Sequence, residues 1–130
     1  MTPLLRGALL ASGPLNLMGA ALFAPPSVAL RAAFGVPEAP AFYQWTIALW
    51  VLAFGVAYAH AGWRGRADGS LLALGAVGKF VFVALMTSMA WRGDVPTPTA
   101  LASLSDLVLA VIFAHAWWRG ARAPAAWGRG

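Results

Sequence analysis

The sequence predicts an all-α integral membrane protein built as a four-helix bundle, and three observations lead to this fold class. Of its 130 residues, 61% are hydrophobic and only 10% are charged. The mean hydropathy is +0.73, and a soluble domain of this size needs more polar surface than such a composition supplies. Four apolar runs of about 20 residues, the length that crosses a bilayer as a helix, fill most of the chain.

The first predicted span covers residues 4–23 and contains Pro14. A proline inside a helix lacks the N–H donor and can kink the helix. An alternative is that Arg6, the apolar stretch after it and residues 20–24, which end in a small-residue cleavage site at Ala24, form a cleavable signal peptide. The run is long for such a segment and carries Asn16 inside it. We therefore expect this segment to be retained as the first helix.

Residues 24–40 form the longest connection and are rich in proline. Within this connection, residues 28–34 predict a short helix preceded by a serine and closed by a glycine. Leu30 and Phe34 share its apolar face, whereas Arg31 points elsewhere. This pattern predicts a short helix that lies at the membrane interface between spans one and two.

The remaining spans are predicted over residues 42–61, 70–91 and 99–118, and short polar turns join them. The transmembrane domain therefore covers residues 1–118. The basic tail that follows, residues 119–130, is rich in Gly, Ala and Arg and has little to pack. We expect this tail to be disordered.

Four spans place both termini on one side of the membrane. Two arginines, Arg31 and Arg92, then fall on the opposite side. Six arginines fall on the side of the termini: Arg6, Arg64, Arg66, Arg119, Arg122 and Arg129. Because positive residues are retained in the cytoplasm, this split predicts that both termini are cytoplasmic, in a bacterial inner membrane. Arginines that flank apolar runs also explain the net charge of +5 without a nucleic-acid partner.

Lys79 lies near the middle of the third apolar run, where a lysine costs about 2.5–3.5 kcal/mol on insertion scales. Asp106 is the only acid inside another apolar run. At 1.5 Å per residue, Lys79 lies roughly 14 Å and Asp106 roughly 18 Å from the inner boundary. Asn16 on the first span reaches roughly the same level as Asp106. We therefore expect three polar side chains from three helices to meet in one layer.

Five polar residues form the candidate ligand site or polar cluster: Asn16, Tyr58, Lys79, Asp106 and Gln44. Two interpretations stay open. The residues either form a neutralised lock that fixes the helix register, or they line a small cavity for a proton, an ion or a polar ligand. We expect no catalytic residue, no metal ligand and no cofactor, because His60 and His115 point away from the predicted interior of the bundle.

The dipeptide Gly78-Lys79, Asp106 and the proline-rich first connection resemble small four-helix bacterial membrane proteins that are grouped loosely around the DoxX-like families. The resemblance covers the four-span layout of essentially the whole chain. Characterised members of those families are described as accessory membrane subunits, including some linked to quinone-dependent respiration and oxidative stress. The resemblance therefore implies a fold rather than an activity.

These observations predict a non-enzymatic accessory or scaffold protein of the bacterial inner membrane. Its partners would be the lipid bilayer and either further copies of itself or a larger membrane complex. The alternatives are a protein that transports or handles a small molecule, proton or ion through a polar cavity, and a membrane enzyme that acts on a lipid or quinone with Lys79 and Asp106 as acid and base.

Overall fold

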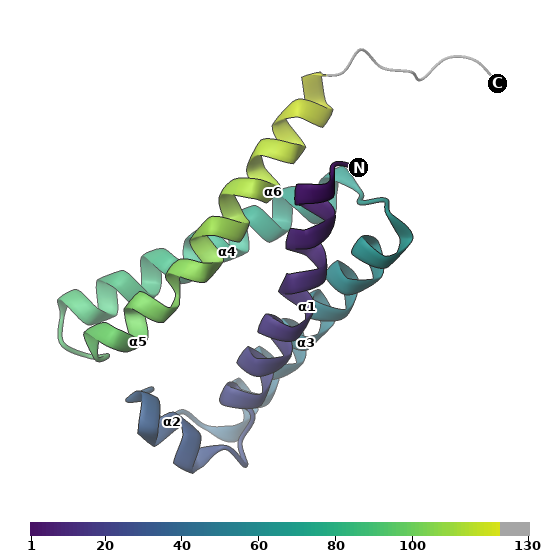
Figure 1. Cartoon of the computed structure of the whole chain (residues 1–130). Coiled ribbons are helices and arrows are strands. Elements are labelled where there is room, and N and C mark those ends of the chain that lie inside the picture. The colour runs from purple at the N-terminus through teal and green to yellow at the C-terminus, as the bar shows by residue number, and fades with distance from the viewer. Residues whose placement is uncertain (123–130) are drawn as a thin grey trace.

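The computed structural model describes residues 1–122, which are helical and contain no strand (Figure 1). The helices are α1 (Pro3–Phe23), α2 (Val28–Phe34), α3 (Ala41–Arg64), α4 (Gly69–Trp91), α5 (Thr97–Ala102) and α6 (Leu104–Arg122). The all-α prediction is confirmed for these residues.

Three helical segments are long and apolar enough to cross a membrane: α3, α4, and α5 together with α6 over Thr97–Gly120. The helices α1 and α2 meet the same criterion only as a pair, and they are bent by 105° at the break between them. Residues 1–122 thus contain three candidate spans, or four when the bent pair is counted as one. This finding agrees with a membrane protein that crosses the bilayer several times.

The helix bounds differ from the predicted spans mainly in the last one. A break at Ser103 divides the run predicted at 99–118 into α5 and α6. There the backbone N–H and the hydroxyl of Ser103 both donate to the carbonyl of Ala100, at 3.0 and 2.6 Å. Helix α6 then continues to Arg122, so it includes the start of the predicted tail. The rest of that tail, residues 123–130, lies outside the described residues.

The helices form two closely packed pairs, α1 with α3 and α4 with α6, and α1 also contacts α6 (Figure 1). Small residues let α1 approach α3. A Cβ atom added at Gly13 would lie 3.0 Å from Cβ of Ala59, and one added at Gly55 would lie 2.7 Å from Cβ of Asn16. Such close contact of small residues is a common way for helices to associate in lipid. Pro14 lies inside α1, which is helical on both sides of it.

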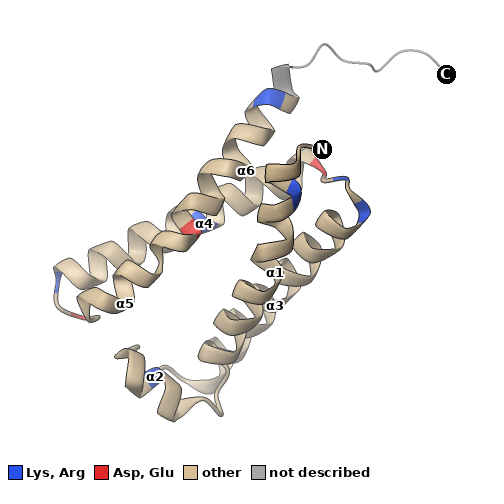
Figure 2. Ribbon diagram, in the orientation of Figure 1, with Lys and Arg blue, Asp and Glu red and all other residues tan. Residues whose placement is uncertain are grey.

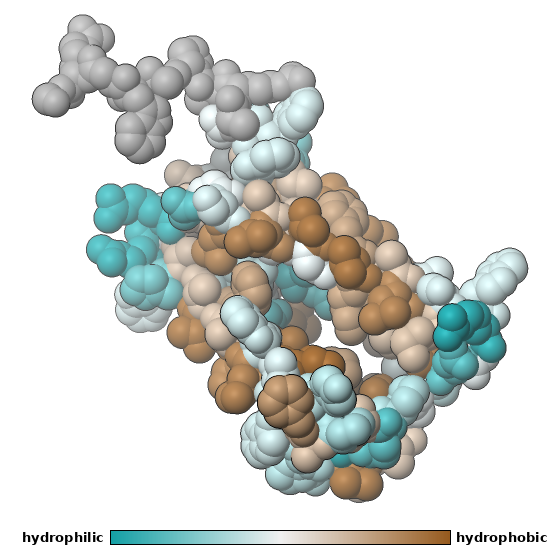
Figure 3. All heavy atoms as spheres, turned by 180° about the vertical axis from the view of Figure 1, so that it is seen from behind, coloured by the Kyte–Doolittle hydropathy of each residue, from teal (hydrophilic) through white to brown (hydrophobic). Residues whose placement is uncertain are grey.

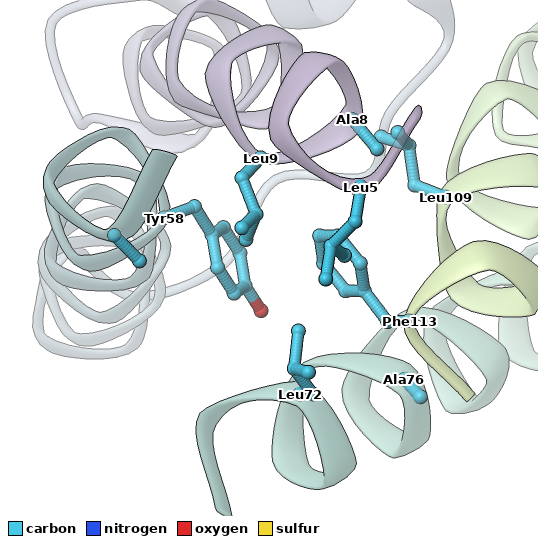
Figure 4. Packing of buried hydrophobic residues seen from close by; sticks show 9 residues of the cluster. Leu5, Ala8, Leu9, Tyr58, Leu72, Ala76, Leu109 and Phe113 are labelled. Atoms are coloured by element: carbon cyan, nitrogen blue, oxygen red, sulfur yellow. The ribbon is translucent and has the colours of Figure 1, made fainter. Parts of the chain in front are cut away.

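The two pairs meet in an apolar core near the N-terminal end of α1 (Figure 4). Leu9 of α1 and Phe113 of α6 are fully buried there. The ring of Tyr58 from α3 lies 5.2 Å from that of Phe113. A Cβ atom at Gly75 of α4 would lie 2.6 Å from the Tyr58 hydroxyl, so glycine at this position makes room for the tyrosine.

The pairs touch again at the opposite end, through α2 and α5. The hydroxyl of Thr99 donates to the carbonyl of Phe34. Gly35 follows α2 with φ of +63°, and a Cβ atom there would lie 2.5 Å from Pro96. Hydrophobic residues cover the middle of the molecule and hydrophilic ones gather at its margins, and the face drawn in Figure 3 is hollowed in its middle. The core and the α2–α5 contact therefore join the pairs at two ends of the molecule.

Candidate polar site between the helix pairs

Lys79 of α4 and Asp106 of α6 form an ion pair in the middle of the molecule. Most other charges lie near the ends of helices, as the blue and red segments of Figure 2 show. The Lys79 side chain is 8% exposed and that of Asp106 is 24% exposed. The break at Ser103 puts Asp106 in the first turn of α6, where a carboxylate interacts favourably with the helix dipole. The structure thus joins two residues that the sequence places in the same layer.

Asn16 connects this ion pair to the other two helices. Its side-chain nitrogen donates to the carbonyl of Val51 on α3 at 3.0 Å. Its side-chain oxygen lies 3.5 Å from Nζ of Lys79, at the long end of the hydrogen-bond range. A continuous series of polar contacts therefore runs from α3 through α1 and α4 to α6.

Tyr58 completes the surroundings of the lysine. Nζ of Lys79 lies 5.7 Å from the centroid of the Tyr58 ring, a distance at which a cation is attracted to an aromatic face. The tyrosine is 3% exposed. The lysine ammonium thus meets a carboxylate, an amide and an aromatic ring, and among the described residues no buried side-chain nitrogen or oxygen lacks a partner.

Gln44 lies apart from the other four candidate residues. It is in the first turn of α3, and the 14 residues to Tyr58 on the same helix correspond to about 21 Å. Its side-chain nitrogen donates to Glu38 at 2.9 Å. Gln44 and Tyr58 are both buried on α3, but they serve different parts of the molecule.

Arg31 forms a second polar cluster that the sequence did not reveal. Its guanidinium is 1% exposed and makes two hydrogen bonds to the carboxylate of Glu38, at 2.8 and 3.1 Å. It also donates to the carbonyls of Leu22, Ala24 and Pro25 at the end of α1. Arg31 points away from Leu30 and Phe34, as expected, but it is buried, because the bend after α1 places α2 against carbonyls that have no helical donor.

Two signals in the sequence point to this second cluster. An arginine and a glutamate stand seven residues apart on either side of a glycine, and the last carbonyls of α1 precede Pro25, which has no N–H. Hydrogen bonds from Arg31, and then from Gln44, hold the pKa of Glu38 below its usual value. The glutamate is still 54% exposed, so the cluster lies at the edge of the molecule.

The histidines do not contribute to either cluster. His60 and His115 are both exposed. No group of three or more His, Cys, Asp or Glu side chains within the described part of the chain is arranged to hold a metal ion.

Comparison with known protein families, with curated proteins and with solved structures finds no match for this chain.

The geometry sets what the site around Lys79 can do. Its cation is neutralised, and the contacts tie together two helix pairs that otherwise meet in the apolar core and through α2 and α5. The carboxylate of Asp106 is the less buried member of the pair and has room to accept a further hydrogen bond.

Proposed function

We propose that this chain is a non-enzymatic accessory or scaffold protein of the bacterial inner membrane. In this proposal the long helices form a four-span bundle, and both termini lie in the cytoplasm. The relationship to the DoxX-like group is part of the proposal and rests on Gly78-Lys79, Asp106 and the proline-rich first connection.

The observation that carries the proposal is the series of polar contacts centred on Lys79. An unpaired lysine within an apolar helix is costly in lipid, so pairing with Asp106 strongly favours one register of α4 against α6. The contact with Asn16 ties the same lysine to the other helix pair. The polar groups of this site find their partners within the described residues. Such an arrangement fits a role in fixing helix positions better than a catalytic role.

The charges support the proposed orientation. Arg31 is paired with Glu38, and Arg92 with Asp94, at the end away from the termini. Arginines at the end of the termini have no such ion pair among the described residues. The positive-inside bias follows the number of Lys and Arg residues, and six arginines at the end of the termini against two at the other support a cytoplasmic location for that end.

The exposed apolar side chains supply surface for partners. Leu74, Val77 and Val81 lie on α4, and Trp50 and Val56 on α3, and each is more than half exposed. Such residues face lipid or a neighbouring protein in a membrane. Self-association or incorporation into a larger complex would cover part of this surface.

A second candidate function follows from the exposure of Asp106. Its side chain is 24% exposed, against 8% for Lys79. Ionisable residues inside membrane proteins often mark the path of a proton, an ion or a polar ligand, and a carboxylate that is partly exposed can be reached by such a species.

A double-mutant cycle tests the register-fixing role. Lys79→Met, Asp106→Leu and the double variant would be unfolded in nanodiscs or bicelles. We expect a coupling free energy above about 1 kcal/mol and a double variant that is much milder than Lys79→Met alone. Effects that simply add would reject the proposed lock.

Two further measurements separate the candidate functions. A scaffold should migrate as an assembly larger than the 13.6 kDa chain after mild extraction, and the double variant should keep that assembly. A proton-handling protein should instead produce a proton flux in proteoliposomes, followed with a pH-sensitive dye, that Asp106→Asn abolishes. A wild-type protein that extracts only as a monomer and gives a flux would favour the second candidate.

A further inference from the structure

The net positive charge of the chain is concentrated at the end where α1 begins. Away from that end, the charged residues form three ion pairs: Arg31 with Glu38, Lys79 with Asp106, and Arg92 with Asp94. The remaining charged residues are six arginines and Asp68, and their sum equals the whole net charge of +5. Within the described chain, Arg6, Arg64, Arg66 and Arg119 lie at this end of the helices (Figure 2).

The single acid at this end is already engaged. A carboxylate oxygen of Asp68 accepts the backbone N–H of Ser70 at 2.7 Å and caps the start of α4. That hydrogen bond lowers the pKa of Asp68, so its carboxylate stays ionised as the cap. None of the ion pairs within the described chain includes Arg64, Arg66 or Arg119. These cations therefore have no acidic partner among residues 1–122.

A cavity of about 640 Å³ opens at the same end, between the start of α1, the turn from α3 to α4, and the end of α6. Leu5, Leu72, Ala116 and Trp117 give it apolar walls, and Arg66 adds a cation. Both Arg66 and Trp117 are exposed, so the cavity is open to its surroundings. Apolar walls beside a cation match the chemistry of an anionic amphiphile at the level of the lipid headgroups.

We propose that this cavity binds an anionic phospholipid from the leaflet that faces the termini. The phosphate contacts Arg66, with the neighbouring arginines adding to the positive field, and the upper part of an acyl chain lies against Leu72 and Trp117. Charge complementarity selects this occupant, because a zwitterionic lipid would not neutralise the unpaired arginines. The inference does not depend on the proposed scaffold role.

The test is a binding measurement on the full chain in a nonionic detergent. Fluorescent phosphatidylglycerol and phosphatidylcholine with identical acyl chains would be titrated at low salt. We expect phosphatidylglycerol to bind at least about fivefold more tightly, and Arg66→Gln to weaken its binding about fivefold with little effect on phosphatidylcholine. Arg66→Lys should keep most of the preference, and raising the salt to about 1 M should remove it.

Two variants distinguish binding inside this cavity from attraction of anionic lipid to positive charge anywhere on the protein. Arg92→Gln removes an exposed arginine at the opposite end and should leave the binding of both lipids unchanged. Trp117→Ala keeps the charge of the cavity but removes one apolar wall, and it should weaken the binding of both lipids severalfold. Equal affinity of the wild type for the two lipids, equal effects of Arg66→Gln and Arg92→Gln, or an unchanged affinity in Trp117→Ala would each overturn the proposal. Circular dichroism and the unfolding temperature would establish that each variant is folded.

Discussion

The cluster around Lys79 and the cluster around Arg31 use the same chemistry in different surroundings. The first joins Lys79 to residues 27 and 63 positions away, in the middle of long apolar helices. The second joins Arg31 to residues six to nine positions away, at a turn near the edge of the molecule. One cluster holds separate helices together, and the other shapes a single connection.

The difference shows that the kind of partner a buried cation requires depends on its depth in the membrane. Lipid offers no hydrogen-bonding partner, so Lys79 depends on Asp106 for neutralisation. The partner of Arg31 is 54% exposed and can be hydrated if the arginine is lost. The bonds from Arg31 to carbonyls of Leu22 and Pro25 nevertheless fix where α1 ends and α2 begins. Loss of the first cluster should therefore affect global stability, and loss of the second should affect local structure.

The largest expected effect compares Lys79→Met with Arg31→Met, two substitutions that each remove a buried cation. Lys79→Met leaves Asp106 without its partner away from water and should cost about 3–5 kcal/mol. Arg31→Met leaves acceptors that water can reach and should cost about 1–3 kcal/mol. Unfolding free energies in nanodiscs measure both. An equal or larger cost for Arg31→Met would show that depth does not separate the two clusters.

The next prediction tests whether the cluster around Lys79 depends on close packing of α1 against α3. A Cβ atom at Gly55 would lie 2.7 Å from Cβ of Asn16. Gly55→Ala should therefore push Asn16 away from Lys79 and cost about 1–3 kcal/mol through overpacking. Gly78→Ala is the matched control, because nothing lies within 4 Å of a Cβ atom there, and it should be neutral or slightly stabilising. Similar unfolding free energies for the two variants would contradict the role of the glycine.

A smaller effect is the dependence of stability on pH, which should involve the cluster around Arg31. The pKa of Glu38 is lowered by Arg31 in the folded protein. A carboxyl group with a lowered folded pKa contributes stability above its unfolded pKa of about 4.3, and loses it as the pH falls through the folded value. The unfolding temperature should therefore fall between about pH 5 and pH 3, and Glu38→Gln should show a shallower fall.

Asp68 provides the control for that pH series, because its pKa is also lowered, through the backbone N–H of Ser70. Asp68→Asn should remove a separate part of the pH dependence. Hydrogen exchange at the turn after α1 should respond to Glu38→Gln and not to Asp68→Asn. If both substitutions change exchange at that turn equally, the acid sensitivity does not come from the cluster of Arg31.

The contrast also explains how much the sequence alone could predict. Apolar runs of bilayer length predict the long helices, and a charge inside such a run is unusual enough to identify Lys79 and Asp106. Arg31 stands in a polar connection, where a charged residue is ordinary, and its burial follows from the 105° bend after α1. A bend of this kind depends on the tertiary structure and leaves no periodic signal.

The break in the last predicted span has a similar cause. Ser103 fits a membrane helix as well as a turn, and the proximity of α2 to α5 depends on packing between residues about 60 positions apart, such as Gly35 and Pro96. The same limit applies to Gln44, whose partner Glu38 lies in the connection before α3, so its contact depends on how that connection folds. Local patterns thus identified the polar residues inside the long helices, but neither the burial of Arg31 nor the way the connections fold.

The smallest expected effect concerns the pair of Arg92 and Asp94, which repeats the arginine–carboxylate chemistry of the Arg31 cluster without burial. Its side chains are 70% and 43% exposed. Exposed pairs contribute about 0–1 kcal/mol and are screened by salt. Arg92→Gln should therefore change the unfolding free energy by less than about 0.5 kcal/mol, and less still at high salt. A cost approaching that of Arg31→Met would show that contact with the carboxylate matters more than burial and the bonds to the end of α1.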